Sequence, residues 1–500
     1  MPDPKYPSLY QVHARLWLSE LGNRLGRSAS FGDIPDADLD RIANLGFDWV
    51  WPLGVWQTGP ASRQESLTDP GCRRGYREVL PDFTDADVYA SPFAIQSYSV
   101  HPDFGGDSPL ARLRQRLRDR GVRLLLDFVP NHTGLDHTWV RERPEFYIQG
   151  TESDLLREPH NYRRLETRAG SVILGHGRDP YFPGWTDTLQ LIYRHAGLRA
   201  AMIAALARVA DRCDGVRCDM AMLLLPDVIL RTWGDRSLPS DGSPPVDASF
   251  WPEAIAQIRR RHPNFLFMAE VYWDLEWTLQ EQGFDYTYDK RLYDRLRSQD
   301  AESVRGHLHA DLDFQRQCVR FLENHDEPRA ASVFPMDVHR AAAVLTFFTP
   351  GMRFLHEGQL EGRRIMAAMQ LGRRQAEDAD AAISDFYRRL LECLKRPEVR
   401  EGNWKLLECR AAWDGNPTWN GFLAFAWEFR AGLRLVAAVN YRSTQGQCYV
   451  RLPFPELAGR TVVLRDLLSS ARYEREGDEL ISRGLYLDVP AWGHHLFEVT

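Results

Sequence analysis

The chain has 500 residues, of which 44% are hydrophobic and 26% are charged, and its formal net charge is -7. This composition is typical of a globular protein, and the length allows one large domain with a smaller one, or several small domains. The negative net charge and the lack of a basic block argue against a nucleic-acid partner. No apolar run approaches the roughly 20 residues that a membrane helix needs, so we expect no membrane partner.

The N-terminal sequence and the cysteines indicate in which cellular compartment the protein is expected. The first residues, "MPDPKYPSLYQVHARLWL", lack a basic region followed by an apolar core, so we expect no signal peptide. The seven cysteines are odd in number and show no paired spacing. We therefore expect reduced thiols and a cytoplasmic location. The sequence leaves the oligomeric state open.

Strand-like and helix-like segments alternate from the N-terminus to about residue 400. The clearest helix spans residues 108–120, where leucines recur at helical spacing, Ser108 can cap the helix and Pro109 suits its first position. Further helices are expected at residues 197–213, 252–262, 339–348 and 382–394. Strands are expected at residues 9–16, 47–53, 122–128, 214–221, 265–273, 284–289, 318–326 and 352–358.

Eight strand-helix units in series predict an α/β fold, a (β/α)8 or TIM barrel. A doubly wound sheet is the rival, but neither of the phosphate-binding loops G-x-G-x-x-G and G-x-x-x-x-G-K-[ST] occurs in the sequence. Two excursions rich in Gly, Pro, Asp and Arg, residues 54–92 and 133–190, are longer than ordinary barrel loops. Each follows a strand, so each should lie at the C-terminal face, where barrel active sites are built.

From about residue 408 the strand-like segments follow one another without helices, which predicts an antiparallel sandwich. The expected organisation is therefore a barrel formed by residues 1–132 and 191–407, with an inserted domain at 133–190. A C-terminal β-sandwich domain at 408–500 completes it.

Four of the expected barrel strands end in a carboxylate. The stretches are "LLLDFVPNH", "GVRCDMA", "FLFMAEVYW" and "FLENHDEPR". A single carboxylate in such a place can cap a helix or pair with an arginine. Four in register are hard to explain by capping, because buried charges cost several kcal/mol unless they are paired. They predict a pocket at the C-terminal face of the barrel.

A cluster of three carboxylates suits cleavage of a glycosidic bond, which uses one carboxylate nucleophile and one protonated acid. Asp219 has Arg217 on the same face of its strand, and an adjacent cation lowers a carboxylate pKa, so Asp219 should stay ionised. Glu270 follows the apolar "FLFMA" and should face other carboxylates, so its pKa should be raised. Asp326, with His325, is then free to bind sugar hydroxyls.

These stretches resemble the conserved regions of glycoside hydrolase family 13, the alpha-amylase family. "DFVPNH", "GVRCDMA", "AEVYW" and "ENHD" resemble its first to fourth regions in order and spacing, and "TPGMRFLHEGQLEG" resembles its eighth-strand signature. The resemblance covers the whole chain. It implies a barrel, an inserted domain after strand three and a terminal sandwich.

The resemblance also implies roles for single residues. Asp219 is expected as the nucleophile, Glu270 as the acid/base and Asp326 as the transition-state stabiliser. The expected substrate contacts are Arg217, His132, His325, Phe93, Asp127 and Tyr272. Of these, Phe93 stands in "SPFAIQSY", where the family usually has a stacking tyrosine. A phenylalanine keeps the stacking and loses the hydroxyl.

The sequence departs from the family pattern in two places. Met222 and Leu223 stand where endo-acting amylases carry Lys-His, which puts starch-type endo-cleavage in doubt. The excursion 54–92, with Trp56, could close the pocket over a short substrate or could be a solvated loop. Its arginines are Arg63, Arg73, Arg74 and Arg77.

No cofactor is required for this chemistry, and calcium is the one ion that the resemblance suggests. The asparagine of the first region, here Asn131, often binds calcium in the family together with acidic residues of the inserted domain. Those acidic partners are not identifiable in this sequence. Neither His132 with His137 nor "HEGQL" has a zinc spacing.

The leading hypothesis is a retaining glycoside hydrolase that cleaves alpha-glucosidic bonds of a small oligosaccharide or glucoside. A transglycosylase or a sugar isomerase could use the same three carboxylates, because these enzymes differ in what resolves the covalent intermediate. A non-catalytic sugar-binding relative is a further alternative, although such relatives normally lose a catalytic carboxylate. The absent phosphate loops argue against a nucleotide-dependent enzyme.

Overall fold

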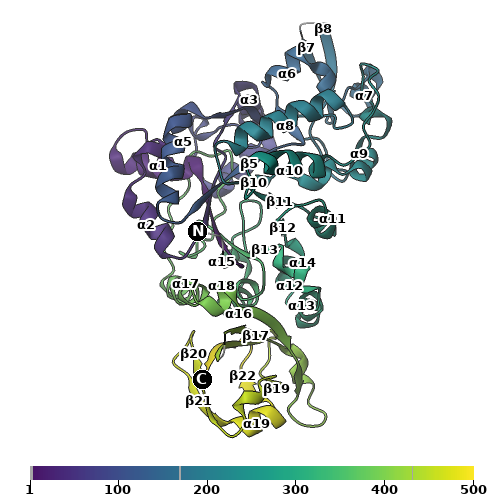
Figure 1. Ribbon diagram of the computed structural model, residues 1–500. Helices are drawn as coiled ribbons and strands as arrows, with labels where there is room; N and C mark the ends of the chain where they lie inside the picture. Colours follow the sequence, from purple (N-terminus) through teal and green to yellow (C-terminus); the bar gives the residue numbers. More distant parts are fainter. Residues whose placement is uncertain (1–3, 168–169, 431) are drawn as a thin grey trace.

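The computed structural model describes residues 4–167, 170–430 and 432–500. Figure 1 shows three parts arranged along one direction. The barrel lies in the middle, the segment that carries β7 and β8 projects at one end, and the terminal sheets lie at the other end. The inserted domain and the terminal domain therefore contact different ends of the barrel.

The centre of the molecule is a closed barrel of eight parallel strands, which confirms the predicted fold. Going round the barrel, the order is β1-β14-β13-β12-β11-β10-β5-β2. The strands are β1 (Ser8–His13), β2 (Trp49–Leu53), β5 (Arg123–Phe128), β10 (Gly215–Cys218), β11 (Leu266–Ala269), β12 (Tyr286–Tyr288), β13 (Cys318–Arg320) and β14 (Met352–His356). Several end earlier than expected, so that Asp219 and Glu270 directly follow their strands, whereas Asp326 lies six residues beyond the end of β13.

Helices surround the barrel and join its strands. They are α1 (Ala14–Leu25), α2 (Asp36–Asn44), α5 (Asp107–Arg118), α8 (Ala196–Ala210), α9 (Pro226–Trp233), α10 (Phe250–Arg261), α11 (Glu276–Glu281), α12 (Lys290–Arg297), α13 (Ala301–Leu308), α14 (Leu312–Arg316), α15 (Ala330–Val333), α16 (Met336–Phe347), α17 (Ala381–Leu394) and α18 (Pro397–Glu401).

Two helix starts differ from the prediction. The capping prediction for α5 is wrong, because Gly106, with a φ of 78°, occupies the N-cap and Ser108 lies inside the first turn. Its three leucines are buried as expected. Helix α10 begins at Phe250, before Pro252, which still lies in the first turn where proline is tolerated.

The excursion 54–92 is structured, so its description as a loop is wrong. It contains β3 (Trp56–Thr58), which pairs with β4 (Ile95–Val100), and the helices α3 (Pro60–Thr68) and α4 (Pro70–Val79). Trp56 is 1% exposed and its Nε1 donates to the Asp127 carbonyl at 2.7 Å. It therefore belongs to the core and does not cover the pocket.

The inserted domain begins and ends on one short sheet. Strands β6 (His132–Gly134) and β9 (Thr188–Gln190) pair antiparallel, with His132 opposite Gln190. Between them lie α6 (Thr138–Glu142), α7 (Glu152–Arg157), β7 (Tyr162–Thr167) and β8 (Gly170–Gly175). This pairing brings the end of the domain beside the first conserved stretch.

Two antiparallel sheets share one core at the C-terminus, which confirms the sandwich. The larger has the order β15-β17-β18-β23-β20-β21 and the smaller β16-β19-β22. Strand β15 makes the sheet start at Asn403, slightly before the expected boundary at residue 408. The elements are β15 (Asn403–Leu407), β16 (Cys409–Ala411), β17 (Phe422–Phe429), β18 (Leu433–Asn440), β19 (Gly446–Val450), β20 (Thr461–Asp466), β21 (Arg472–Glu476), α19 (Gly477–Ser482), β22 (Leu485–Val489) and β23 (His494–Val499).

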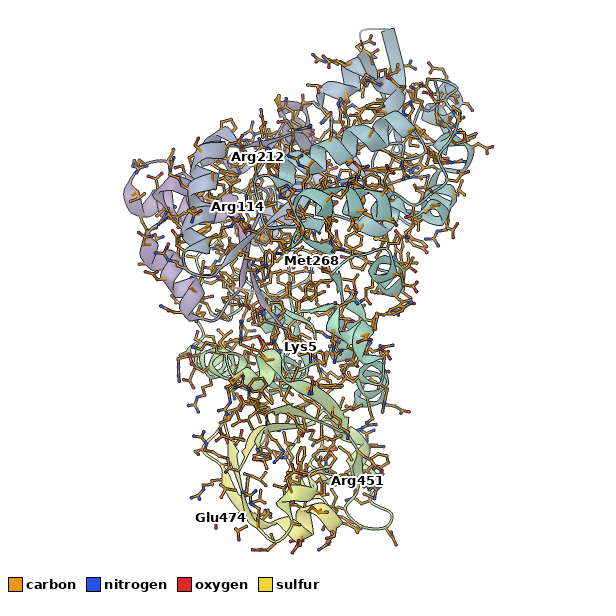
Figure 2. All side chains as sticks on the ribbon, viewed as in Figure 1. Lys5, Arg114, Arg212, Met268, Arg451 and Glu474 are labelled. Carbon is orange, nitrogen blue, oxygen red and sulfur yellow. The ribbon has the colours of Figure 1, made fainter. Side chains whose placement is uncertain are left out.

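Side chains fill the space between strands and helices (Figure 2). Met268 lies within the barrel, whereas Arg451 and Glu474 lie on the terminal domain. All seven cysteines are free thiols. Within the described ranges, no helix combines the length and the apolar character needed to span a bilayer.

Candidate active site

The structure brings the three expected catalytic carboxylates into one cavity of about 340 Å³ at the C-terminal face of the barrel. Three of the expected substrate contacts, His132, Phe93 and Tyr272, line the same cavity. The complete lining is Ser91, Phe93, His132, Trp185, Asp187, Thr188, Asp219, Met220, Glu270, Tyr272, Asp326, Met369 and Gln370. Two larger hollows open beside the N-terminal ends of the strands, away from these carboxylates.

Arg217 is the buried cation of the site. It lies on β10, is 1% exposed, and stands opposite Asp127 on β5. Its Nη1 donates to Oδ1 of Asp219, and its Nη2 lies 2.7 Å from Oε2 of Glu270. The guanidinium also lies over the Phe93 ring, 5.1 Å from its centroid. One arginine therefore serves two carboxylates and a ring from behind the cavity wall.

Met220 positions Glu270 by way of its backbone, a role that the sequence analysis missed. Its φ is 42°, a left-handed conformation that costs a non-glycine residue roughly 1 kcal/mol. In this conformation the Met220 N–H donates to Oε2 of Glu270 at 2.8 Å, while the Tyr272 hydroxyl donates to Oε1 at 2.8 Å. Both oxygens of Glu270 are thus oriented by the two residues beside it in the cavity.

Burial dominates the protonation of the two central carboxylates. It raises the pKa of Asp219, with Arg217 acting in the opposite direction and Asp326 adding to the increase. It also raises the pKa of Glu270, again against Arg217, and both Asp219 and Asp326 reinforce the effect. The expected lowering by Arg217 is present at Asp219, but desolvation outweighs it. The expected increase at Glu270 agrees with the structure.

His325 supports Asp326. Its Nε2 lies 3.1 Å from Oδ2 of Asp326, and its Nδ1 is 2.9 Å from Nε2 of Gln11. Burial keeps the pKa of His325 well below its usual value, so the ring is neutral. Burial raises the pKa of Asp326 to about 6, and Glu327 adds to this while Arg217 opposes it. His325 thus acts behind Asp326 and is not part of the cavity lining.

His132 forms the wall shared by the barrel and the inserted domain. Its ring meets that of Trp185 edge-on, with centroids 5.2 Å apart. Burial lowers the pKa of His132 to about 3, so the imidazole is neutral and can exchange hydrogen bonds with a hydroxyl. Trp185 was not anticipated, although it stands near the end of the inserted domain, which the expected topology places beside the pocket.

Asp127 was expected to contact the substrate, but the structure places it behind the cavity wall. Trp51 Nε1 donates to its Oδ1 at 3.1 Å and the Gly54 N–H donates to its Oδ2 at 2.8 Å. The residue is 1% exposed and does not line the cavity. Burial raises its pKa to about 7, partly against Arg217. Its carboxyl group holds the end of β2 against β5 and is out of reach of a sugar in the cavity.

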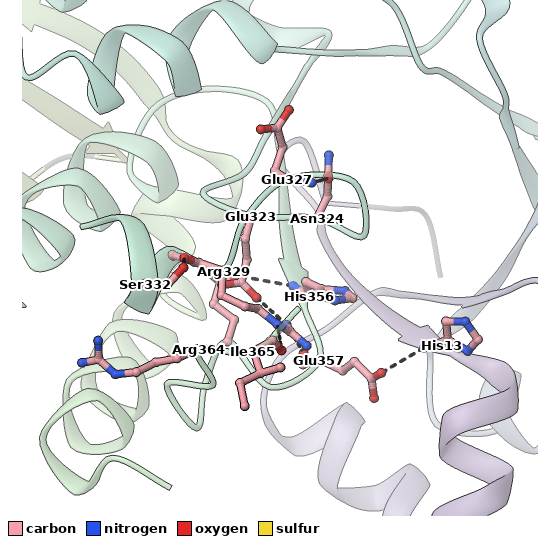
Figure 3. Close-up of polar contacts among 12 residues, drawn as sticks. His13, Glu323, Asn324, Glu327, Arg329, Ser332, His356, Glu357, Arg364 and Ile365 are labelled. Carbon is pink, nitrogen blue, oxygen red and sulfur yellow. Dashed lines mark hydrogen bonds and ion pairs between the residues drawn. The ribbon is translucent and has the colours of Figure 1, made fainter. Parts of the chain in front are cut away.

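A buried ion pair closes the turn that carries His325 and Asp326 (Figure 3). Arg329 Nη1 donates to Oε1 of Glu323 at 2.7 Å, and the Ala330 N–H donates to Oε2 of Glu323 at 2.7 Å. Both charged side chains are at most 2% exposed. The pair sets the ends of the turn, so it fixes where Asp326 enters the cavity.

The same arginine reaches the segment after β14, which carries Met369 and Gln370. Arg329 Nη1 donates to the Glu357 carbonyl at 2.7 Å (Figure 3). Further along, the Met369 carbonyl lies 3.2 Å from Nε2 of His13, and the Gln370 carbonyl accepts from the Tyr89 N–H at 2.7 Å. The excursion 54–92 thus supports the cavity wall at Gln370. This role differs from the two expected ones, a cover over the pocket and a solvated loop.

Two of the four arginines of that excursion stabilise it internally. Arg63 Nε donates to the Val88 carbonyl at 2.7 Å, and Arg73 Nη1 donates to Asp85 at 2.7 Å. Met222 and Leu223, which replace the Lys-His pair of endo-acting amylases, are buried at 0% and 4% exposure. Their side chains belong to the core and present no polar group to the cavity.

The surroundings of Asn131 do not fit calcium. Its Oδ1 and its carbonyl accept hydrogen bonds from Nε2 of Gln190 at 2.8 and 3.0 Å, so an amide donor occupies the place of a cation. Calcium prefers six to eight oxygen ligands. Across the described ranges, no group of three or more His, Cys, Asp or Glu side chains is arranged to hold a metal.

The fold and the site define a (β/α)8 barrel protein with four acidic residues, among them the three expected catalytic carboxylates, in one cavity at the C-terminal face. Residues 39–404 match the family model described as "Alpha amylase, catalytic domain". The chain therefore belongs to the alpha-amylase family, glycoside hydrolase family 13, as its motifs predicted.

Individual relatives are distant. The alpha-amylase MalA of Haloarcula japonica is 25% identical over 364 residues, which cover 71% of this chain and 44% of that protein. An alpha-glucosidase of Culex pipiens is 22% identical over 400 residues, which cover 72% of this chain and 63% of that protein. The chain thus spans about half to two thirds of the length of these relatives. The crystal structure of an alpha-amylase from Lactobacillus plantarum shares the fold, with a TM-score of 0.67 at 21% identity over 99% of this chain and 98% of that one.

Proposed function

We propose that this protein is a retaining glycosidase that hydrolyses alpha-glucosidic bonds of a small oligosaccharide or glucoside. The observation that carries the proposal is the meeting of Asp219, Glu270 and Asp326 in one cavity, with Arg217 behind the first two. A volume of about 340 Å³ is at the small end for ligand sites, which supports a short substrate.

In the first step, the Asp219 carboxylate attacks the anomeric carbon and the glycosidic bond breaks. Glu270 gives its proton to the departing oxygen, so the leaving group departs as an alcohol. In the second step, Glu270 takes a proton from water, and the resulting oxygen nucleophile displaces Asp219 from the sugar. Two displacements at one carbon return the original alpha configuration.

The remaining groups have supporting roles. Arg217 favours the ionised form of Asp219, and Asp326 binds sugar hydroxyls as positive charge develops on the ring. The Phe93 ring offers a face for stacking, as the sequence suggested. We further propose a cytoplasmic location, which the seven free cysteines support.

The test is incubation with maltose, isomaltose, trehalose, sucrose, maltoheptaose and starch, with products followed by proton NMR from the first minutes. We expect alpha-configured product from at least one short substrate and slow reaction of starch. Beta-configured product would contradict the retaining mechanism. Longer or rearranged sugars would identify a transglycosylase or an isomerase, and no reaction with any substrate would contradict the proposal.

A further inference from the structure

One carboxylate in the cavity has no part in the mechanism above. Asp187 lies on the wall formed by the inserted domain, beside Trp185 and Thr188. Its backbone is fixed, because the Thr188 N–H donates to the Trp185 carbonyl at 3.0 Å and the Ser62 hydroxyl donates to the Asp187 carbonyl at 2.8 Å. Asp187 therefore belongs to a rigid turn in the cavity wall.

The Asp187 carboxyl group differs from those of Asp127 and Glu323, which are held by donors from other residues. Asp127 accepts from two donors, and Glu323 pairs with an arginine. In the part of the chain that the structure describes, Asp187 forms no ion pair with lysine, arginine or histidine, and its one recorded hydrogen-bond donor is its own N–H. Burial raises its pKa to about 6, its own N–H opposes this, and Glu65 adds to it.

A carboxylate that is partly removed from water needs hydrogen-bond donors, because leaving it without them costs free energy. Within the cavity, those donors can come with the ligand. A sugar ring carries hydroxyl groups on neighbouring carbons, and a carboxylate can accept from two of them through its two oxygens. Asp187 lines the same cavity as the catalytic carboxylates, so a hydroxyl of a bound sugar is a suitable donor.

The charge of the cavity restricts the ligand further. Its described lining contains four carboxylates, Asp187, Asp219, Glu270 and Asp326, and neither lysine nor arginine. Arg217 lies behind the wall and is already shared by two of them. A phosphate or carboxylate group on the substrate would meet like charges without a cation, and this repulsion is strong in a site of low dielectric.

We propose that Asp187 binds hydroxyl groups of the substrate sugar and makes the cavity selective for neutral glucosides over phosphorylated ones. This rests on the proposed function, since it concerns the substrate of the same site. Asp187 is in this view a specificity-determining residue outside the catalytic three. Its position near the end of the inserted domain makes that domain part of substrate recognition.

The test compares wild type, Asp187→Ala and Asp187→Asn on the best neutral disaccharide, on its monodeoxy analogues and on its 6-phosphate. We expect Asp187→Ala to lower kcat/KM about ten- to hundredfold, mainly by raising KM, as for loss of a hydrogen bond to a charged group. One deoxy analogue should have a low kcat/KM with the wild type and no lower kcat/KM with Asp187→Ala. The hydroxyl that this analogue lacks is the one that Asp187 binds. Asp187→Asn should narrow the preference for the neutral sugar over the phosphorylated one.

Glu65→Gln is the matched control. Glu65 is a carboxylate close enough to act on Asp187, but it pairs with Arg163 at 2.6 Å and does not line the cavity. It should leave the deoxy-analogue pattern unchanged. Equal losses for the parent sugar and all deoxy analogues with Asp187→Ala, or no loss, would overturn the inference.

Failure of the proposed function is separable from failure of this inference. A wild-type protein that hydrolyses none of these sugars contradicts the function. The inference is then decided by calorimetric binding of the disaccharide to wild type and Asp187→Ala. Weaker binding to the variant supports it, whereas equal binding or no binding to either overturns it.

Discussion

Two charged clusters lie at the same end of the barrel and behave differently. The catalytic cluster, Arg217 with Asp219, Glu270 and Asp326, has three carboxylates for one arginine and opens into the cavity. The paired cluster has two carboxylates and two arginines, none of which lines the cavity, and consists of Glu323, Arg329, Glu357 and Arg374. The two clusters differ in the ratio of carboxylates to arginines and in their access to the cavity.

The pKa directions follow the number of cations beside each carboxylate, even within one cluster. Burial acts to raise the pKa of Glu357, but Arg374 and Arg329 outweigh it and the pKa is lowered. Glu323, with one arginine, has a pKa raised by burial. Glu270 shares its arginine with Asp219, and its pKa is raised as well. A buried carboxylate in this fold stays readily ionised when two cations face it, and it is available as an acid when cations are scarce.

Asp219→Asn should have the largest effect on activity and little effect on folding. It removes the nucleophile, so kcat should fall by more than about 10⁴-fold. Arg217 keeps Glu270 as a partner, so the fold should persist. Initial rates on the best disaccharide measure the first effect, and thermal unfolding measures the second. An active variant would show that the catalytic cluster is not the reaction centre.

Arg329→Met should have the largest effect on stability. It leaves Glu323 buried without its cation, and breaking a buried pair costs about 3–5 kcal/mol. Arg329→Lys is the control, because it keeps the charge and loses the planar fork, so it should cost less. Urea unfolding measures the loss of unfolding free energy for both variants. If Arg329→Met unfolds at the same urea concentration as wild type, the two clusters do not differ as described.

Asp326→Asn should stabilise the protein slightly in a defined pH range. The pKa of Asp326 is raised from its ordinary 3.8 to about 6, so the folded state holds this proton more tightly than the unfolded chain. Stability is therefore lost as pH rises from about 4 to 6, and asparagine avoids that loss.

The difference in Tm between Asp326→Asn and wild type should accordingly be near zero below pH 4 and reach about 1 °C above pH 6. It should be small because the carboxyl group faces the open cavity and keeps contact with solvent. Calorimetry across this range measures it. A difference that grows toward low pH would have the wrong sign and would contradict the raised pKa.

A calcium chelator should have the smallest effect on either cluster. Gln190 Nε2 donates to both oxygens of Asn131, so an amide donor stands where a cation would have to bind. We expect Tm and activity to be unchanged by EDTA and by added calcium. A rise in Tm of several degrees with calcium would show that the ion binds in spite of this amide pair.

Much of the architecture follows from local sequence patterns. The eight strand-helix units, the terminal strands and the buried leucines of α5 were predictable, because hydrophobic periodicity and turn residues are written in short segments. The helices α3 and α4 were missed, since their glycine, proline and arginine content is typical of loops. Their position depends on long-range contacts, such as the ion pair of Glu65 with Arg163 and the hydrogen bond from the Ala61 N–H to Asp136.

The catalytic residues were accessible from sequence because each follows an apolar barrel strand, Asp219 and Glu270 directly and Asp326 after a short turn, and parallel strands in a barrel end at one face. The sequence alone thus determined the barrel, its family and the three carboxylates. Only the tertiary structure decided that Asp127 is held by Trp51 and Gly54, that Met220 orients Glu270 by way of its backbone, and that Asp187 joins the cavity. These facts depend on distances between residues far apart in the chain, and such distances are set by packing, which no local pattern records.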